Sequence, residues 1–283
     1  MKIRAYAKIN LLLDILGKRQ DGYHLLDMIM QTVSLYDDID ISLNDSGKIT
    51  VSSSDNALGG ENDITYKAAK LFLDFVGSDK GVSIKTEKHI PVAAGLGGGS
   101  SDAAAVITAL NKLLDTDIPK NQLEALCLKL GADVPYFLYG GTKAVGGIGE
   151  ILKPLAAMPE SYIVIVKYGE KASTGEIYRK IDAMENIDHP QMQIACKMLE
   201  KSDLKGFSGT LKNVFGIIWD MELPKQIMEQ NGALTSLLTG SGPSYFGIFE
   251  TEKQAQNAVD AFKEKGIAAY LVKPVAVPNS IIE

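Results

Sequence analysis

The feature that most constrains the fold is a glycine-rich segment, Pro91-Val-Ala-Ala-Gly-Leu-Gly-Gly-Gly-Ser-Ser101. It follows a short alternating stretch, residues 82–86, that predicts a strand. It precedes a run whose apolar residues share one helical face: Ala103, Val106, Ile107, Leu110, Leu113 and Leu114. Because glycine has no Cβ, such a loop can turn its amides inward, and the helix adds free amides and the positive end of its dipole. This order of elements predicts a phosphate-binding loop.

The loop differs from two common phosphate-binding patterns. No Lys-Ser/Thr pair follows its last glycine, so it is not a Walker A loop, and Ser100 takes the third glycine position of the dinucleotide fingerprint. A bare glycine run is equally well a flexible surface loop, but the flanking strand and helix favour phosphate binding. A second cluster, Gly240-Ser241-Gly242-Pro243, predicts a hairpin-like turn when taken alone. Together, the two loops fit a site where backbone approaches a polyanion from two sides.

Polar residues with a chemical use stand out at three further places. Lys8 and Asn10 interrupt an otherwise apolar predicted strand, residues 3–16. A strand lysine more often lies at a sheet edge or faces solvent, but beside a phosphate loop it would supply a fixed charge. Asp133 follows a predicted helix, where it is either an ordinary turn residue before proline or a general base. Tyr23 and His24 follow an Asp-Gly turn and are either solvent-facing or a platform for a nucleobase.

Composition excludes several classes of protein. The 283 residues are 46% hydrophobic and 23% charged, which is typical of a globular protein of about two domains. A net charge of -6 gives no general attraction to nucleic acid or anionic lipid. Cys127 and Cys196 lie among apolar residues and predict free thiols rather than a disulfide framework or a zinc site. No apolar run is long enough to span a bilayer and no signal peptide is visible, so we expect a cytoplasmic protein.

Strands and helices mix in both halves, which predicts an α+β or α/β class. Lys153-Pro154 and Met158-Pro159 are typical of a linker, so we expect one domain over residues 1–152 and another over 153–283. Other expected elements are a helix over 62–76 ending at Gly77, a helix from Pro119 to Gly131, a buried strand at Ile163–Val166, a helix beginning at Ser173 with capping-box spacing, strands at Tyr245–Phe249 and Ala268–Lys273, and a helix from Thr251 to Gly266.

Together these residues resemble the GHMP superfamily of galacto-, homoserine-, mevalonate- and phosphomevalonate-type kinases. Its lysine strand, glycine loop and C-terminal Gly-Ser-Gly-Pro loop appear here as Ala7–Leu11, Pro91–Ser101 and Thr239–Ser244. Within it, the chain resembles the branch that acts on a cytidine diphosphate-linked methylerythritol, because of Asp21-Gly-Tyr-His24 and Gly131-Ala-Asp-Val-Pro135, together with the extended Gly-Leu-Gly-Gly-Gly loop and the Ser-Thr pair that ends at Thr174. The motifs occur in order over nearly the whole chain.

The resemblance implies an α+β fold, with an N-terminal ATP-binding domain and a C-terminal ferredoxin-like domain around an active-site cleft. It implies phosphorylation of the free 2-hydroxyl of that small-molecule substrate, with ATP and Mg²⁺, in the non-mevalonate isoprenoid pathway. By matching position, Lys8 and Asp133 become the catalytic pair. The ATP-binding residues become Asn62 and Pro91, Val92, Ala93, Ala94, Gly95, Leu96, Gly97, Gly98, Gly99, Ser100 and Ser101. The substrate-binding residues become Asn10, Tyr23, His24, Thr174, Tyr178, Gly240 and Ser241.

In this scheme Tyr23 and Tyr178 would sandwich the cytosine, and His24 would hydrogen-bond to its edge. Asn62 is equally well a plain helix N-cap, and Thr174 has the same alternative. One stretch departs from the family: Ala144-Val-Gly-Gly-Ile-Gly-Glu150 lacks the basic residue that is usual before the Gly-Glu pair. The resemblance therefore assigns no residue here to a contact with a substrate phosphate, while the expected chemistry is unaffected.

Two other functions stay open from the sequence. A homoserine or mevalonate kinase, or a related decarboxylase, would share the loops but would need no aromatic platform for a nucleobase. A non-catalytic module is the other alternative, because the same fold type occurs in a ribosomal protein domain. The net charge of -6 and the Lys8 and Asp133 pair count against RNA binding.

Overall fold

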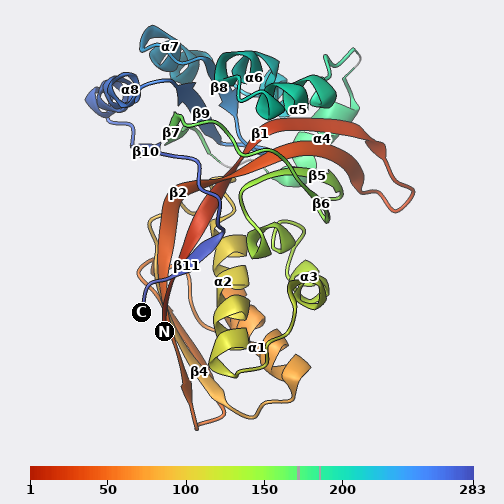
Figure 1. Cartoon of the computed structure of the whole chain (residues 1–283), viewed down its shortest axis with the longest axis vertical. Helices are drawn as coiled ribbons and strands as arrows, with labels where there is room; N and C mark the ends of the chain where they lie inside the picture. Colours follow the sequence, from red (N-terminus) through yellow and green to blue (C-terminus); the bar gives the residue numbers. More distant parts are fainter. Residues whose placement is uncertain (171–172, 185) are drawn as a thin grey trace.

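The computed structural model describes residues 1–170, 173–184 and 186–283 and arranges them around two sheets (Figure 1). The first sheet is built on a long antiparallel pair, β1 (Lys2–Lys18) and β2 (His24–Asn44). Its strand order is β11-β1-β2-β4-β3, and β5 and β6 extend it from β2. These strands span Ile49–Ser53 (β3), Gly81–Glu87 (β4), Thr142–Gly147 (β5), Ile151–Pro154 (β6) and Asn279–Ile281 (β11).

Helices cover one face of this sheet: α1 (Ile64–Val76), α2 (Gly98–Leu113), α3 (Lys120–Leu128) and the 3₁₀ turn η1 (Pro135–Leu138). The expected helix ending at Gly77 is confirmed, with Gly77 in the left-handed conformation at φ 65°. The apolar stripe of α2 is also confirmed, since Ala103, Val106, Ile107 and Leu110 are fully buried. α2 packs against both β1 and β2, so the glycine loop that begins this helix is held against the centre of the sheet.

The second sheet has four antiparallel strands in the order β10-β7-β9-β8. The order of its elements along the chain, βαββαβ, makes this part ferredoxin-like, as the resemblance implied. Its strands span Tyr162–Lys167 (β7), Thr235–Leu238 (β8), Ser244–Phe249 (β9) and Ala269–Val272 (β10). Its helical segments are α4 (Thr174–Asp182), α5 (Met192–Glu200), α6 (Leu204–Thr210), η2 (Val214–Ile218), α7 (Glu222–Gln230) and α8 (Glu252–Glu264).

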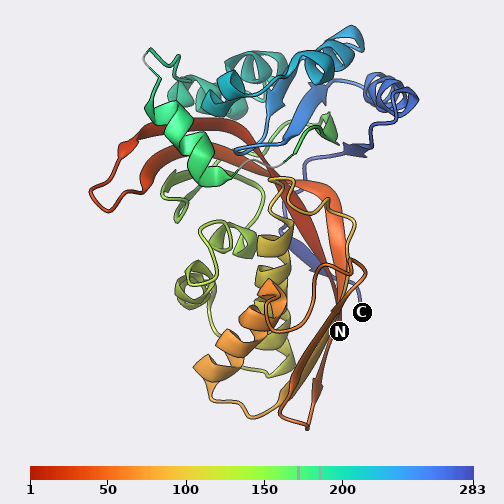
Figure 2. The same ribbon diagram turned by 180° about the vertical axis from the view of Figure 1, so that it is seen from behind.

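The long β1–β2 pair of the first sheet runs from the lower part of the molecule to its upper part, where β2 contacts β10 of the second sheet (Figures 1 and 2). The chain returns to the first sheet at its end, where Ile281 of β11 pairs with Ile3 of β1. Lys153 and Pro154 lie in strand β6, so the linker expected at these two residues is wrong. The division into residues 1–152 and 153–283 stays a prediction. Among the described residues, no helix combines the length and the apolar character needed to cross a bilayer.

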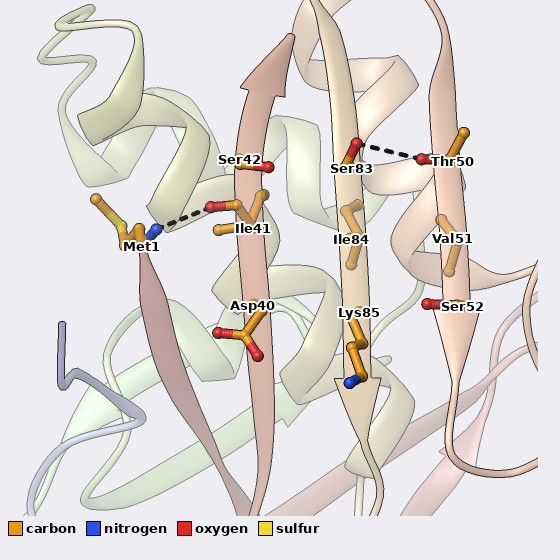
Figure 3. A pocket seen from close by; sticks show the side chains of 10 residues that line it. All are labelled: Met1, Asp40, Ile41, Ser42, Thr50, Val51, Ser52, Ser83, Ile84 and Lys85. Atoms are coloured by element: carbon orange, nitrogen blue, oxygen red, sulfur yellow. Dashed lines mark hydrogen bonds between the residues drawn. The ribbon is translucent and has the colours of Figure 1, made fainter.

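The other face of the first sheet carries polar side chains along β2, β3 and β4. A shallow hollow of about 570 Å³ lies there, with Asp40, Ser42 and Lys85 among its lining residues (Figure 3). These exposed residues alternate with Ile41 and Ile84, which are buried in the core with α1. An antiparallel sheet commonly has one solvated face, which accounts for this alternation. The hollow shares no residue with the glycine loop.

Candidate active site

A cavity of about 720 Å³ borders the glycine loop. It gathers residues from both halves of the chain. Those expected from the sequence are Lys8, Asn10, Asn62, every residue from Pro91 to Ser100, Asp133, Tyr178, Gly240 and Ser241. Ser101 is not among the lining residues, because it lies behind the loop and its hydroxyl donates to the Tyr6 carbonyl at 2.7 Å.

The glycine loop reaches the cavity with conformations that require glycine. Gly97 has φ 73°, and a Cβ there would lie 2.6 Å from Cζ of Phe137. Gly95 has φ 75°, and a Cβ there would lie 3.0 Å from the carbonyl oxygen of Gly242 in the second glycine loop. α2 begins directly after Gly97, with neither a side-chain cap nor an acidic residue in its first turn. Its free amides and positive dipole end are therefore available to an anion.

Lys8 lies at the base of the cavity with only 5% of its side chain exposed. This burial makes the solvent-facing alternative wrong, and at Lys8 the strand pairs with Thr32 of β2 on one side and meets the glycine loop on the other. Its Nζ donates to Oδ1 of Asn10 at 2.7 Å and lies 3.6 Å from Oδ2 of Asp133. Its backbone N–H donates to the Leu96 carbonyl at 2.9 Å, which ties the strand to the glycine loop.

Asp133 lies in the turn between α3 and η1, and its side chain is 39% exposed. The turn is closed by a hydrogen bond of 3.1 Å from the Val134 N–H to the Gly131 carbonyl. Lys8 and Asp133 are far apart in sequence, and the packing of η1 against α2 and of α2 against β1 brings them together. The pair thus presents an accessible carboxylate beside a buried ammonium group.

The second glycine loop joins β8 to β9, so the hairpin-like turn expected from the sequence is confirmed. The same loop reaches the cavity through Gly240 and Ser241, and Oγ1 of Thr239 accepts a hydrogen bond of 2.8 Å from the Asn10 N–H. Nδ2 of Asn213 donates to the carbonyl oxygens of Leu238 and Gly240 at 2.8 and 2.9 Å. Asn213 was not expected from the sequence, and no motif around it signals this contact.

A second cavity of about 350 Å³ adjoins the first, and Tyr178 and Ile148 line both. Within it, the His24 ring stacks on Tyr178, with ring centroids 4.4 Å apart, while Tyr23 is 60% exposed. A sandwich between two tyrosines is therefore not preformed, because the imidazole lies on the face of Tyr178. Burial first, and then the charge of Asp133, raises the pKa of Tyr178 to about 12. Ile148 belongs to the stretch that lacks the expected basic residue.

Asp182 and Lys18 also line the second cavity and were missed in the sequence. Oδ1 of Asp182 lies 2.6 Å from Nε2 of His24, and Lys18 donates to its other oxygen at 2.9 Å. Hydrogen bonds from Lys18 and His24 lower the pKa of Asp182. Asp182 is four residues after Tyr178 in α4, a spacing that places both on one helix face and that could have identified it.

Three smaller expectations concern caps and flanking residues. Asn62 lines the main cavity but does not cap α1; Asp63 does, accepting a hydrogen bond of 2.8 Å from the Thr65 N–H. Ser173 caps α4, and the side chain of Thr174 lies outside the part of the chain that the structure describes. Lys88 and Asp102, which flank the glycine loop, also line the main cavity and were not singled out from the sequence.

Known proteins are similar to this chain in both fold and sequence. Family models described as GHMP kinases N terminal domain and GHMP kinases C terminal match residues 63–141 and 225–268. A 4-diphosphocytidyl-2-C-methyl-D-erythritol kinase of Clostridium botulinum (strain Eklund 17B) is 39% identical over 280 residues, which cover 97% of this chain and all of the relative. A crystal structure of 4-(cytidine 5'-diphospho)-2C-methyl-D-erythritol kinase has a TM-score of 0.83 and 31% identity, covering 97% of this chain and 99% of its own.

A homoserine kinase structure from Cytophaga hutchinsonii has a TM-score of 0.77 at 18% identity, and it covers all of this chain and 97% of its own. A likeness at that identity concerns the fold alone. The full-length relatives at higher identity carry the narrower assignment. The chain belongs to the family of 4-diphosphocytidyl-2-C-methyl-D-erythritol kinases, within the GHMP kinases.

Proposed function

We propose that the chain transfers the γ-phosphoryl group of ATP to the 2-hydroxyl of 4-diphosphocytidyl-2-C-methyl-D-erythritol. The observation that carries this proposal is the pair formed by Lys8 and Asp133, 3.6 Å apart in the cavity that the glycine loop lines. The family of the chain supports the same activity.

Phosphoryl transfer depends mainly on positioning and on neutralising negative charge. Residues Pro91–Ser100 and the N-terminus of α2 would bind the ATP phosphates through backbone amides. The approach of Gly95 to Gly242 places the second glycine loop beside the first, so a polyanion would meet backbone from two sides. Asn62, at the rim of the same cavity, remains our candidate for a contact to the adenine.

Asp133 would accept the proton of the substrate hydroxyl, because its carboxylate is accessible and lies in the same cavity as the phosphate loop. Lys8 would orient that carboxylate and stabilise charge that develops on the transferred group. Its Nζ is already held by Asn10, so little reorganisation is needed when the substrates bind.

The side chains around the cavity could bind Mg²⁺ only if the ATP phosphates supplied most of its ligands. Among the described residues, no group of three His, Cys, Asp or Glu side chains could hold a metal ion. Mg²⁺ commonly takes one or two carboxylates together with substrate phosphates. Of the carboxylates that line the cavity, Asp63 caps α1 and Asp102 pairs with Lys88, which leaves Asp133 to face the ion. When bound, the ion would offset the charge of the phosphates.

The second cavity supports a nucleobase rather than a small amino or carboxylic acid at the distal end of the substrate. Its aromatic lining of Tyr23, His24 and Tyr178 provides stacking surface, and the cavity connects to the catalytic pair through Tyr178. For the base to stack on Tyr178, the His24 ring must leave the position that it occupies in this structure.

The test is a comparison of acceptor alcohols with the purified chain, ATP and Mg²⁺. ADP release and phosphorus NMR of the product would be measured for 4-diphosphocytidyl-2-C-methyl-D-erythritol, homoserine and mevalonate. We expect turnover with the cytidine compound at a kcat/KM at least about a hundredfold above the other two, since a site built for a polar group discriminates strongly against ligands that lack it. Preference for homoserine or mevalonate, or retention of RNA without turnover, would overturn the proposal.

A further inference from the structure

A buried cluster of charged side chains lies directly beneath the glycine loop. Nζ of Lys88 donates to Oδ2 of Asp37 and, at 2.6 Å, to Oδ2 of Asp102. Only 8% of the Lys88 side chain is exposed, with 0% for Asp37 and 4% for Asp102. Lys88 comes just before the loop, Asp102 just after it, and Asp37 belongs to the central strand β2. The cluster therefore joins both ends of the loop to the sheet.

The two carboxylates have different surroundings. Oδ1 of Asp37 accepts hydrogen bonds from the N–H groups of His89 and Ile90 at 2.6 and 2.8 Å, in addition to the contact with Lys88. Hydrogen bonds of this kind stabilise the ionised carboxylate. Asp102 contacts Lys88 through one oxygen only, and its buried Oδ1 has no hydrogen-bond partner. An ionised oxygen left unpaired at such a site is costly.

Lys88 is the only described cation in contact with this pair of carboxylates. From β1, the nearby Lys8 faces Asn10 and Asp133 instead. At the start of α1, the carboxylate of Asp63 accepts hydrogen bonds from the N–H groups of Gly59 and Thr65 instead. His89 is exposed and lies near Glu87. With both carboxylates ionised, the cluster would carry a net negative charge beside the triphosphate site.

The same contacts shift the pKa values of Asp102 and Lys88. Burial is the largest influence on Asp102 and raises its pKa; Lys88 opposes this, Asp37 adds to it, and the pKa rises to about 7. Burial alone would lower the pKa of Lys88, but the attraction of the two carboxylates outweighs it and raises the pKa. Lys88 therefore stays charged at neutral pH, and Asp102 is the group that changes its charge there.

We propose that Lys88, Asp37 and Asp102 form a clamp that positions the phosphate loop at both ends, and that Asp102 is protonated when ATP is bound. Lys88 is the positioning residue of this clamp, which has no net charge in that state: Lys88 is cationic, Asp37 anionic and Asp102 neutral. The proposal rests on the assignment of the main cavity to ATP. Its consequence is that ATP binding takes up a proton on Asp102 at pH values where free Asp102 is ionised.

The first experiment compares wild type with Asp102→Asn, and uses Asp40→Asn, an exposed position on β2, as the matched control. ATP binding is measured by calorimetry between about pH 6 and about pH 9, in buffers of different ionisation enthalpy. ATP itself titrates in this range, so the quantities compared are the differences between the proteins in ATP affinity and in proton uptake. Above about pH 7, the wild type and Asp40→Asn should lose ATP affinity by up to about tenfold per pH unit relative to Asp102→Asn and take up more protons.

Asp102→Asn should bind ATP at least as tightly as wild type, since an amide resembles the protonated carboxyl. The proposal that Asp102 is protonated in the ATP complex would be overturned by a large loss of ATP affinity in Asp102→Asn. It would also be overturned if this variant had the same pH dependence and proton uptake as wild type. Asp37→Asn should behave differently and weaken ATP binding at every pH, because it removes the anion that holds the loop start.

The second experiment tests the positioning role with Lys88→Met, Lys88→Arg and the exposed control Lys85→Met. Lys88→Met should raise the ATP KM at least about tenfold with a smaller effect on kcat, since a displaced loop weakens nucleotide binding first. Lys88→Arg should restore part of the affinity, and Lys85→Met should match wild type. An unchanged ATP KM in Lys88→Met would overturn the clamp.

Failure of the clamp and failure of the proposed function are distinguishable, because the calorimetry with ATP needs no acceptor alcohol. If Lys88→Met does not fold, the nearly isosteric Asp102→Asn still decides the protonation state. If wild type binds no ATP at all, the assignment of the cavity fails rather than the clamp within it.

Discussion

At the scale of single residues, the site depends on a buried lysine next to an exposed aspartate. Lys8 has little contact with water, so its charge is stabilised by the Asn10 oxygen and by Asp133 rather than by solvent. Asp133 keeps access to the cavity, which a proton acceptor needs. The exposed side of the pair can therefore react while the buried side stays in place.

Asp133→Asn should lower kcat by at least about a hundredfold, because an amide cannot accept the hydroxyl proton, while the ATP KM changes little. Steady-state kinetics with 4-diphosphocytidyl-2-C-methyl-D-erythritol and ATP measure both quantities. Asp260→Asn, at an exposed position on α8, is the control and should match wild type. Near-normal turnover of Asp133→Asn would remove this residue from the chemical step.

At the scale of elements, the glycine loop and α2 act as one unit, because the left-handed Gly97 directly precedes the helix. The loop has little space behind it, since Phe137 and the Lys8 side chain pack against Gly97. Gly99 differs: it is helical, and a Cβ there would make an ordinary contact of 3.5 Å with Ile64. Neighbouring glycines in one motif therefore carry different constraints.

Gly97→Ala should raise the ATP KM at least about tenfold and lower the free energy of unfolding by about 1–3 kcal/mol, because the new Cβ collides with Phe137 at a strained φ. Gly99→Ala is the matched control and should keep both values near those of wild type. Urea denaturation and ATP-dependent kinetics provide the two measurements. Equal effects at the two positions would show that flexibility, rather than the specific turn, is what the glycines supply.

At the start of α1, two neighbouring residues have different expected roles: Asp63 caps the helix and Asn62 lines the cavity. Asp63→Ala should lower the free energy of unfolding by about 1 kcal/mol, because the Thr65 N–H loses its acceptor. Asn62→Ala should leave the unfolding free energy unchanged and raise the ATP KM if Asn62 contacts the adenine. Denaturation curves and kinetics of the two variants, measured side by side, give the comparison. Destabilisation by Asn62→Ala with an unchanged KM would reverse these roles.

At the scale of the whole molecule, the site exists because two sheets meet along β1. Asn10 connects them, since its side chain contacts Lys8 and its backbone N–H donates to Thr239. β-bulges interrupt the pairing of β1 with β2 near these positions, between Ala7 and Tyr6 and between Asn10 and Leu12. Bulges often redirect side chains next to active sites. The position of Lys8 therefore depends on contacts with the C-terminal half.

Thr239→Val should lower the free energy of unfolding by roughly 1–3 kcal/mol, because the Asn10 N–H becomes a buried donor without an acceptor. It should also lower kcat, since Asn10 holds Lys8. Thr239→Ser keeps the hydroxyl and should retain kcat. Unfolding by urea and steady-state kinetics test both points, and a Thr239→Val protein as stable and active as wild type would contradict this coupling.

Local sequence determined the glycine loop, the helix that follows it, the end of α1 at Gly77 and the cap at Ser173. Each depends on contacts within a few residues, where glycine conformation, capping and apolar periodicity act directly. Asn62 shows the limit of this reasoning, because a one-residue difference in the helix start moved the cap to Asp63. The resemblance to the family predicted that Lys8 and Asp133 act together, whereas their local sequence patterns alone do not connect them.

Only the tertiary structure decided which distant groups meet. The return of β11 to β1, the stacking of His24 on Tyr178, and the clamp that Asp37, Lys88 and Asp102 form all join residues whose local patterns carry no sign of one another. The physical reason is that burial and pairing of charges depend on the neighbours that folding supplies. The local sequence around a lysine or aspartate does not indicate whether water or another side chain will stabilise its charge.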